Sequence, residues 1–359
     1  MKRNLNSTLI KLSLTTSLSL GMVISIPAVF SAPPSNEAPK QHKIPDHLID
    51  KIALILISHA LTYDIDKLSV DSSLDKSNTP PLKGIDQVKA KIAKAVELNQ
   101  PILLNLVGFP YKSTNASRKV LKPQLDYAER HSLEYLNAML DEIANIYPPG
   151  AKITIFTDGT AFCDMEGIGD EVIALYEQQL KQVAKDLTHI QITTLADLLP
   201  GKTPQEMRDH IESFAPDQAE FQAKLETDPH LKDEVNVLTQ RMTLELDHPE
   251  GHDYTATHPV RDIATKLTQR SLQYSAFLKS YRPAEAIRLS VHYQPDVSTK
   301  MGIGLSFQSH ITPWHGVFIQ NQDGSAEIRH LEDVDTENYT HTTRVVNGIS
   351  LSLLLWRRR

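Results

Sequence analysis

The sequence predicts an α/β fold in which a Rossmann-like parallel sheet is flanked by helices, with a helical insertion and a C-terminal mixed or antiparallel β extension. Three times, a helical pattern is followed by a tight turn and a short apolar run, and these runs end near residues 107, 156 and 195. Such alternation is typical of parallel sheets. Residues 203–283 then carry helical spacing, and the chain beyond residue 286 contains the period-two alternation of strands.

The composition is that of an ordinary globular protein with room for a sizeable core: the chain has 359 residues, of which 40% are apolar and 23% charged. Its net charge of −7 argues against nucleic-acid binding, because nucleic-acid-binding domains are usually strongly basic. The single cysteine, Cys163, excludes an internal disulfide framework and a cysteine zinc site.

Residues 1–31 have the layout of a secretory signal peptide. A basic start precedes an uncharged stretch over residues 12–30, and small residues permit cleavage after Ala28 or Ser31. Serine, threonine and a proline dilute the apolar stretch, so no stable membrane span is expected. An uncleaved anchor and a non-secretory leader remain alternatives. The Pro-rich residues 32–46 are expected to form a disordered linker.

The first predicted helices cover residues 47–61 and 85–98, where apolar residues recur at intervals of three and four. The apolar run Ile102–Val107 is a predicted buried strand, because Gly108 and Pro110 end it at once. A long helix, a β-branched strand, a third helix and a third strand are then predicted at residues 125–146, 152–156, 170–187 and 190–195.

The loop after the first strand carries Lys112, Ser113 and Asn115. In open α/β sheets ligands bind at the carboxyl ends of the strands, so we expect this loop to form half of an active site. Lys112-Ser113 is similar to the end of a phosphate-binding P-loop, but the glycine spacing of that motif is absent. No GxGxxG occurs in the sequence, so nothing indicates a dinucleotide.

Two carboxylates follow the second predicted strand. The strand runs directly into Thr157-Asp158-Gly159, and Asp164 comes seven residues after Thr157. A carboxylate beside a glycine turn at a strand end is where α/β proteins often bind a ligand. An Asp-Gly turn with no other role explains the same pattern equally well.

Residues 203–283 are predicted to be mostly helical, with breaks near Pro229 and in a loop at residues 248–259. Their many charges indicate mainly a solvated face. Three histidines in that loop make a metal site conceivable, although no helical ligand pair such as HExxH is present.

The C-terminal third contains the most suggestive polar residues. Residues 286–293 alternate between apolar and polar side chains, which predicts a strand with Arg288, Ser290 and His292 on one face. Arg288 and His292 would then offer a surface for anion binding and proton transfer. The alternative is an edge strand whose polar face lies in water.

Further strands are predicted at residues 300–307 and 317–320, the second in a hairpin with a turn at Asp323-Gly324. Between them, Trp314-His315 lies between a proline and a glycine, which suits the lining of a pocket better than a core. Residues 345–356 predict either a final strand or a docking tail.

Five segments occur in a set order: GFPYKSTN (108–115), YPPGAKITIFTDGTAFCD (147–164), AIRLSVHYQP (286–295), KMGIGL (300–305) and TPWHG (312–316). In this order and spacing they resemble the isocyanide synthase family of pyoverdine/dityrosine biosynthesis. The resemblance extends from about residue 48 to residue 330. It implies an isocyanide synthase-like catalytic domain over residues 47–335 and leaves 336–359 as a C-terminal tail of unknown role.

The resemblance implies that an aromatic amino acid, tyrosine or tryptophan, receives an isonitrile on its amino group, with ribulose 5-phosphate as carbon donor and without a metal or organic cofactor. Condensation of the amine with the sugar ketone would be followed by proton transfers and carbon–carbon cleavage. The implied setting is secondary metabolism of the pyoverdine, paerucumarin or dityrosine type, with an iron/2-oxoglutarate oxygenase as pathway partner.

This chemistry needs phosphate-binding groups and proton carriers. Lys112 and Arg288 are the implied cations, with Ser113 and Asn115 as hydrogen-bond donors. Imine formation and cleavage require groups that carry protons near neutrality, and His292 and His315 fit this role best, so that Lys112, His292 and His315 are the expected catalytic residues.

The amino-acid end of the implied site needs an acid and an aromatic neighbour. Asp158 or Asp164 would hold the substrate ammonium or the sugar hydroxyls. Trp314 would flank an aromatic ring, and packing in the core is the alternative.

The leader conflicts with the implied chemistry, because it reads as secretory whereas ribulose 5-phosphate is a cytoplasmic metabolite. Three alternatives to an isonitrile synthase therefore stay open: an exported, non-catalytic protein that binds an amino acid or a sugar phosphate on the same fold, an enzyme that forms N-formyl amino acids, and a metal-dependent hydrolase.

Overall fold

The computed structural model of the protein describes residues 46–60, 85–292, 299–307 and 310–357. The predicted signal peptide and nearly all of the predicted linker lie outside these ranges. Within them, no helix combines the length and the apolar character needed to cross a membrane.

The central element is a five-stranded parallel sheet with the strand order β3-β2-β1-β4-β5. This confirms the predicted Rossmann-like sheet. Its strands are β1 (Ile102–Val107), β2 (Ala151–Phe156), β3 (Ile190–Thr193), β4 (Ile287–Ser290) and β5 (Met301–Gly302).

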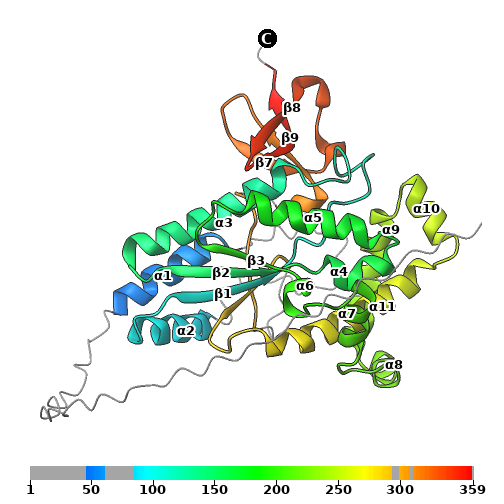
Figure 1. Ribbon diagram of the computed structural model, residues 1–359, viewed down its shortest axis with the longest axis horizontal. Helices are drawn as coiled ribbons and strands as arrows, with labels where there is room; N and C mark the ends of the chain where they lie inside the picture. The colour runs from blue at the N-terminus through cyan, green and yellow to red at the C-terminus, as the bar shows by residue number, and fades with distance from the viewer. Residues whose placement is uncertain (1–45, 61–84, 293–298, 308–309, 358–359) are drawn as a thin grey trace, which may run out of the picture. The chain divides into compact units, whose positions relative to one another are not determined.

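The helices before and between the first three strands flank this sheet. In Figure 1, α3 and α5 lie above the strands and α2 lies below them. A cluster of buried side chains joins them to β1, β2 and β4, because each helix turns an apolar stripe toward the sheet. These helices are α1 (Asp46–Ser58), α2 (Ile85–Glu97), α3 (Tyr127–Ile146) and α5 (Asp170–Val183).

The predicted helical insertion lies between β3 and β4. It comprises α6 (Leu195–Leu198), α7 (Pro204–Glu212), α8 (Gln218–Thr227), α9 (Pro229–Glu245), α10 (Pro249–Thr255) and α11 (Val260–Phe277).

The prediction of a loop at residues 248–259 is wrong, because α10 occupies most of it. Proline suits the first turn of a helix, where its missing N–H costs nothing, and Pro249 stands there. The Gly251 N–H donates to Nδ1 of His248, which caps the helix.

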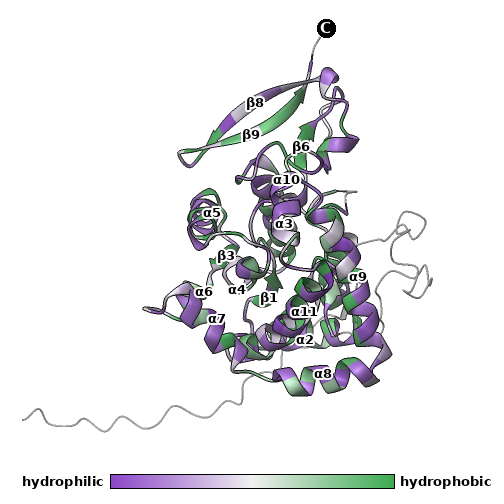
Figure 2. Ribbon diagram, turned by 90° about the vertical axis from the view of Figure 1, so that its right-hand side faces the viewer, coloured by the Kyte–Doolittle hydropathy of each residue, from purple (hydrophilic) through white to green (hydrophobic). Residues whose placement is uncertain are grey.

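A second, four-stranded sheet with the order β7-β6-β9-β8 forms the C-terminal extension. It is mixed, as predicted: β6 pairs with β7 antiparallel and with β9 parallel. Residues assigned to a tail after residue 335 therefore include two full strands, and Figure 2 shows the apolar β9 beside the polar β8. The strands are β6 (Val317–Gln320), β7 (Ala326–Arg329), β8 (Tyr339–Val346) and β9 (Ile349–Trp356).

Strand β4 is an interior strand, so the alternative of an edge strand with one face in water does not hold. It pairs with β1 on one side and with β5 on the other. The chain order runs outward from β1 through β2 to β3 and then returns to β4 on the opposite side of β1. Loops leave in opposite directions at such a point, and the crevice between them is where α/β sheets bind ligands.

Candidate active site

The loop that follows β1 has a strained backbone held by packing. Phe109 has a φ of 60°, which a bulky residue adopts only when its surroundings compensate. Its fully buried ring meets the ring of Trp314 edge-on at 5.2 Å. A Cβ on Gly108 would lie 3.0 Å from Trp314, so the glycine makes room for that ring. Trp314 is only 5% exposed, so it packs in the core, which was the alternative to flanking a substrate ring.

The loops after β1 and β2 touch each other. A Cβ on Gly159 would lie 2.1 Å from the carbonyl oxygen of Pro110, so only glycine permits this approach. Asp158, the preceding residue, is thereby held close to Tyr111, whose pKa it helps to raise.

Lys112 does not reach the crevice. Its side chain is fully buried, and its Nζ lies 2.9 Å from Asp126, 3.1 Å from Glu129 and 2.7 Å from the carbonyl oxygen of Pro313. Asp126 and Glu129 form the capping box that starts α3. Burial, more than Lys112 can offset, raises the pKa of Glu129 to about 8, which favours its neutral form at pH 7. Lys112 therefore joins three segments of the fold, and this environment does not suit the predicted phosphate anchor.

Ser113 and Asn115 bind the C-terminal end of α9. The Ser113 hydroxyl donates to Oε1 of Glu245, and Nδ2 of Asn115 donates to the carbonyl oxygens of Leu244 and Glu245 at 3.3 and 3.4 Å. Both side chains are buried. They fix the position of Glu245 instead of reaching out as hydrogen-bond donors to a ligand.

Glu245 connects this loop to the predicted catalytic residue His315. Its Oε2 accepts from Nζ of Lys119 and lies 3.5 Å from Nε2 of His315. Burial acts to raise the pKa of Glu245, but His315, Lys119 and Ser113 outweigh it and lower that pKa to about 2. The Thr312 hydroxyl lies 3.0 Å from Nδ1 of His315, so both ring nitrogens have a neighbour.

The structure brings His292 and His315 together, as predicted, although they lie in different segments. The pKa of His315 is lowered to about 4 by burial first and also by neighbours that include His292. The pKa of His292 is lowered to about 4 by burial and by Arg241 and Lys300. Both imidazoles are therefore neutral at pH 7 and able to accept a proton. The side chain of His292 is nevertheless exposed to solvent.

Cations gather beside His292. Leu289 pairs with Met301, so Arg288 and Lys300, one residue earlier on each strand, lie abreast on β4 and the start of β5. Arg282 belongs to the same group, because it and Arg288 both lower the pKa of Lys300. Burial lowers the pKa of Arg288 as well. We call Arg282, Arg288 and Lys300 the cationic group.

One face of α9 runs along the whole site. Glu234, Arg241 and Glu245 are spaced by seven and four residues and so lie on the same side of the helix. Glu234 raises the pKa of Lys300, Arg241 lowers the pKa of His292, and Glu245 raises the pKa of His315. With a rise of about 1.5 Å per residue, this face extends about 16 Å, enough to span two small substrates.

Three acidic and hydroxyl side chains, which we call the acidic group, lie next to Glu245: Tyr111, Asp158 and Glu166. The hydroxyl of Tyr111 hydrogen-bonds Glu166. Burial raises the pKa of Asp158 to about 7, and burial together with Glu245 and Asp158 raises that of Glu166 to about 7. Among the described residues, Oδ1 of Asp158 is buried with no hydrogen-bond partner, and the side chain caps neither the turn nor α4 (Gly159–Phe162). A buried carboxyl oxygen of this kind is poised for a ligand.

Asp164 lies apart from this arrangement. Its Oδ1 accepts from Arg270 at 2.7 Å, and its Oδ2 lies 4.0 Å from Arg208. It lines a separate cavity of about 580 Å³ among α8, α10 and α11, with Tyr254 and His258 on the wall. Of the two predicted acids, Asp158 is the one that joins the site.

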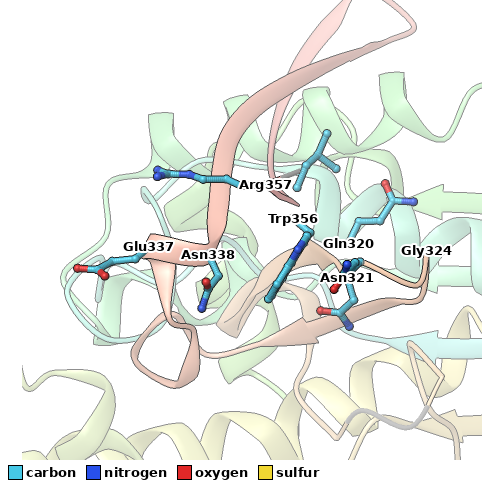
Figure 3. A pocket seen from close by; sticks show the side chains of 9 residues that line it. Gln320, Asn321, Gly324, Glu337, Asn338, Trp356 and Arg357 are labelled. Atoms are coloured by element: carbon cyan, nitrogen blue, oxygen red, sulfur yellow. The ribbon is translucent and has the colours of Figure 1, made fainter. Parts of the chain in front are cut away.

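A further cavity of about 1140 Å³ lies at the ends of the strands of the second sheet, lined by Gln320, Asn321, Trp356 and Arg357 among others (Figure 3). None of the predicted site residues lines it. Among the residues that the structure describes, no group of three or more histidine, cysteine, aspartate or glutamate side chains is arranged to hold a metal ion.

The structure brings together some of the predicted side chains and places the others elsewhere. Arg288, His292, His315 and Asp158 come together, whereas the remaining predicted residues pack or position other groups. The candidate site also contains residues that the sequence did not predict: Tyr111, Lys119, Glu166, Arg241, Glu245, Arg282 and Lys300. Two of them, Tyr111 and Lys300, lie within the segments on which the family resemblance rests.

Comparison with known proteins identifies the family of the chain. The family model described as "Pyoverdine/dityrosine biosynthesis protein" matches residues 92–342. The L-tyrosine isonitrile synthase of Pseudomonas aeruginosa is 32% identical over 261 residues, which are 69% of this chain and 78% of the relative. The L-tryptophan isonitrile synthase AmbI2 of Fischerella ambigua is 30% identical over 238 residues, 64% of this chain and 71% of the relative.

The fold is shared with a solved relative. The crystal structure of the PvcA protein from Pseudomonas aeruginosa matches with a TM-score of 0.71 and 27% identity, covering 86% of this chain and 100% of that one. The parallel sheet with its helical insertion and second sheet is thus the fold of an isonitrile synthase-related protein. The chain belongs to the pyoverdine/dityrosine biosynthesis protein family and is an enzyme of the isonitrile synthase type.

Proposed function

We propose that the enzyme converts the amino group of tyrosine or tryptophan to an isonitrile with ribulose 5-phosphate as carbon donor, in secondary metabolism of the pyoverdine or dityrosine type. The observation that carries this proposal is the division of the site into a cationic group and an acidic group on either side of two neutral histidines. A phosphorylated ketone and an amino acid have complementary charges at their ends.

The cationic group supports binding of the phosphate. Burial lowers the pKa of all three; Arg288 lowers the pKa of Arg282 and Lys300 further, Arg282 adds to the effect on Lys300, and Glu234 opposes it there. Like charges held this close in a half-buried place repel each other, and a bound dianion relieves that repulsion. Guanidinium groups also bind phosphate oxygens through paired hydrogen bonds. Arg288 keeps its predicted role, and Lys112 is replaced by Arg282 and Lys300.

The acidic group supports binding of the amine. Asp158 carries a buried oxygen that no described residue satisfies, and a substrate ammonium would donate to it. An amine must lose its proton before it attacks a ketone. Because the pKa values of Asp158 and Glu166 are raised to about 7, either carboxyl group is suited to take up that proton near neutrality.

The histidines support the later proton transfers. Loss of water from the condensed intermediate and cleavage of the two carbon–carbon bonds at the former ketone carbon each require a proton to move at or next to the reacting carbon. His292 is the imidazole nearer the cationic group and His315 the one held by Glu245 and Thr312. The resemblance also implies an iron/2-oxoglutarate oxygenase acting on the product, which we retain as the proposed pathway partner.

The two halves of the site are separable by kinetics. Arg288→Gln is expected to raise KM for ribulose 5-phosphate by about 10- to 100-fold, the loss of one or two charged hydrogen bonds, and to leave KM for the amino acid within about twofold. Asp158→Asn is expected to do the converse. Arg329→Gln, which removes a half-exposed arginine paired with Glu327 on β7, is the matched control. Equal effects of both variants on both substrates would contradict the division of the site.

A further inference from the structure

Lys300 occupies a position between the two functional parts of the site. It lies abreast of Arg288 across the β4–β5 pairing. Arg288 and Arg282 lower the pKa of Lys300, and Lys300 in turn lowers the pKa of His292. Lys300 therefore has the guanidinium group of Arg288 beside it and His292 within its electrostatic reach, and His292 in turn influences His315. A substrate whose phosphate meets the arginines would extend past the amine of Lys300 toward the imidazoles.

The surroundings of Lys300 favour the unprotonated amine. Burial, with Arg288 and Arg282 adding to it and Glu234 opposing it, lowers the pKa of Lys300 to about 8. At pH 7 about a tenth of such an amine is unprotonated, against roughly three in ten thousand for an ordinary lysine. Lysines made nucleophilic in this way, by burial beside another cation, form imines with carbonyl substrates.

We propose that Lys300 forms an imine with the ketone of the phosphorylated sugar before the amino acid reacts. This inference rests on the proposed function, because it takes the sugar phosphate as the substrate of the same site. It goes beyond that function in assigning a covalent intermediate to the enzyme.

The step balances without an oxidant or reductant. Nζ of Lys300 attacks the ketone carbon, a new C–N bond forms, and the carbonyl oxygen takes a proton. The resulting carbinolamine loses water and leaves a protonated imine. The amino group of the amino acid then attacks the same carbon, and Lys300 leaves as the amine while the substrate nitrogen gives up a proton. The net result is the condensed imine, one water and the original enzyme.

The neighbours of Lys300 suit each of these proton movements. His292 is neutral at pH 7 and lies close enough to Lys300 for that lysine to lower the pKa of the imidazole. His292 is therefore placed to move the proton onto and off the oxygen. The arginines favour the neutral form of Lys300 before the sugar phosphate binds, and they then hold its phosphate. A protonated imine is also more electrophilic than a ketone, which favours attack by the second amine.

Borohydride trapping tests this inference. The full-length enzyme is incubated with ribulose 5-phosphate and sodium borohydride, without amino acid, and the intact mass and peptide masses are recorded. We expect one reduced sugar-phosphate adduct on the peptide that contains Lys300. We expect no adduct with Lys300→Arg, and isonitrile formation that falls by about 100-fold or more.

Lys91→Arg is the matched control. Lys91 is also half-buried and its pKa is also lowered by burial and by Arg288, but it lies on α2, outside the β4–β5 pairing that places Lys300 beside Arg288. We expect this variant to form the adduct normally. Labelling spread over several lysines, no adduct on Lys300, or a wild-type rate in Lys300→Arg would overturn the inference.

The same experiment separates the inference from the proposed function. An enzyme that makes isonitrile but never forms the adduct retains its function and refutes the role of Lys300. An adduct on Lys300 without isonitrile from any aromatic amino acid supports the imine and refutes the proposed function. Absence of both adduct and product contradicts both.

Discussion

Replacing Lys112 by methionine is expected to destabilise the fold without a specific loss of phosphate binding. The side chain is fully buried and its Nζ makes contacts of 2.7, 2.9 and 3.1 Å to Pro313, Asp126 and Glu129. Methionine fills a similar volume but leaves a buried carboxylate without its cation. Removing one partner of a buried ion pair costs about 3 to 5 kcal/mol. For a domain of this size that corresponds to a fall in Tm of about 6 to 10 °C, at about 2 °C per kcal/mol.

Lys181→Met provides the control. Its Nζ lies 2.6 Å from Asp197, a shorter ion pair than either one of Lys112, but the two side chains are 39% and 43% exposed. Pairs exposed to this extent contribute about 0.2 to 1 kcal/mol, so its Tm should change by no more than about 2 °C.

Thermal unfolding and steady-state kinetics together decide the matter. We expect Lys112→Met to show the lower Tm, and its remaining folded enzyme to bind ribulose 5-phosphate with a KM within about threefold of wild type. A variant with an unchanged Tm and a KM raised by about 30-fold or more would refute the reasoning and restore Lys112 as a phosphate anchor.

Three further predictions concern the carboxylate of Glu245, the imidazole of His292 and the close approach of two loops at Gly159. The pKa of Glu245 is lowered in the folded protein to about 2, so its stabilising contribution is present above about pH 4.5 and is lost as the pH falls through 2. Over that interval the free energy of unfolding, measured with urea, should fall by about 3 kcal/mol more in the wild type than in Glu245→Gln. The pKa of His292 is lowered to about 4, so the unfolded chain binds more protons between about pH 6.5 and 4, and the folded protein loses stability as the pH falls through that interval. His292→Gln should show a shallower loss, and an identical loss would contradict the lowered pKa. Gly159→Ala places a Cβ 2.1 Å from the carbonyl oxygen of Pro110, and should cost at least about 1 to 3 kcal/mol in thermal unfolding, whereas an unchanged Tm would show that the two loops do not abut.

The strands of the main sheet were largely predictable because their signals are local. Ile102–Val107 and Ala151–Phe156 are short apolar or β-branched runs bounded by glycine and proline, and their observed limits match the predicted ones to within a residue. Strand β5 is shorter than predicted, with two residues in place of eight. The length of β5 depends on its pairing with β4, which the residues of β5 alone do not reveal.

The side chains of the site were less predictable because their partners are distant in sequence. Lys112 follows a strand as a ligand-binding residue would, but its surroundings come from α3 and the turn at Pro313. The capping box of Asp126 and Glu129 starts α3, and nothing local in the sequence indicates that a lysine pairs with it.

The charges on α9 show the same difficulty from the other side. Glu234, Arg241 and Glu245 have the spacing of one helix face, and such a face usually lies in water. Only the fold, which lays α9 beside His292 and His315, brings these charges to the candidate site. The pattern identifies the face, and tertiary packing decides what it meets.

The central claim is that this site joins an aromatic amino acid to the ketone carbon of ribulose 5-phosphate. The most direct measurement is mass spectrometry of the product formed by the purified enzyme from tyrosine or tryptophan and ribulose 5-phosphate labelled with ¹³C at the ketone carbon. We expect an isonitrile whose added carbon carries the label, because that carbon stays bound to nitrogen when the sugar chain is cleaved. An unlabelled isonitrile would contradict the carbon donor, a labelled formamide would favour the N-formyl reaction, and no product with any aromatic amino acid would contradict the claim itself.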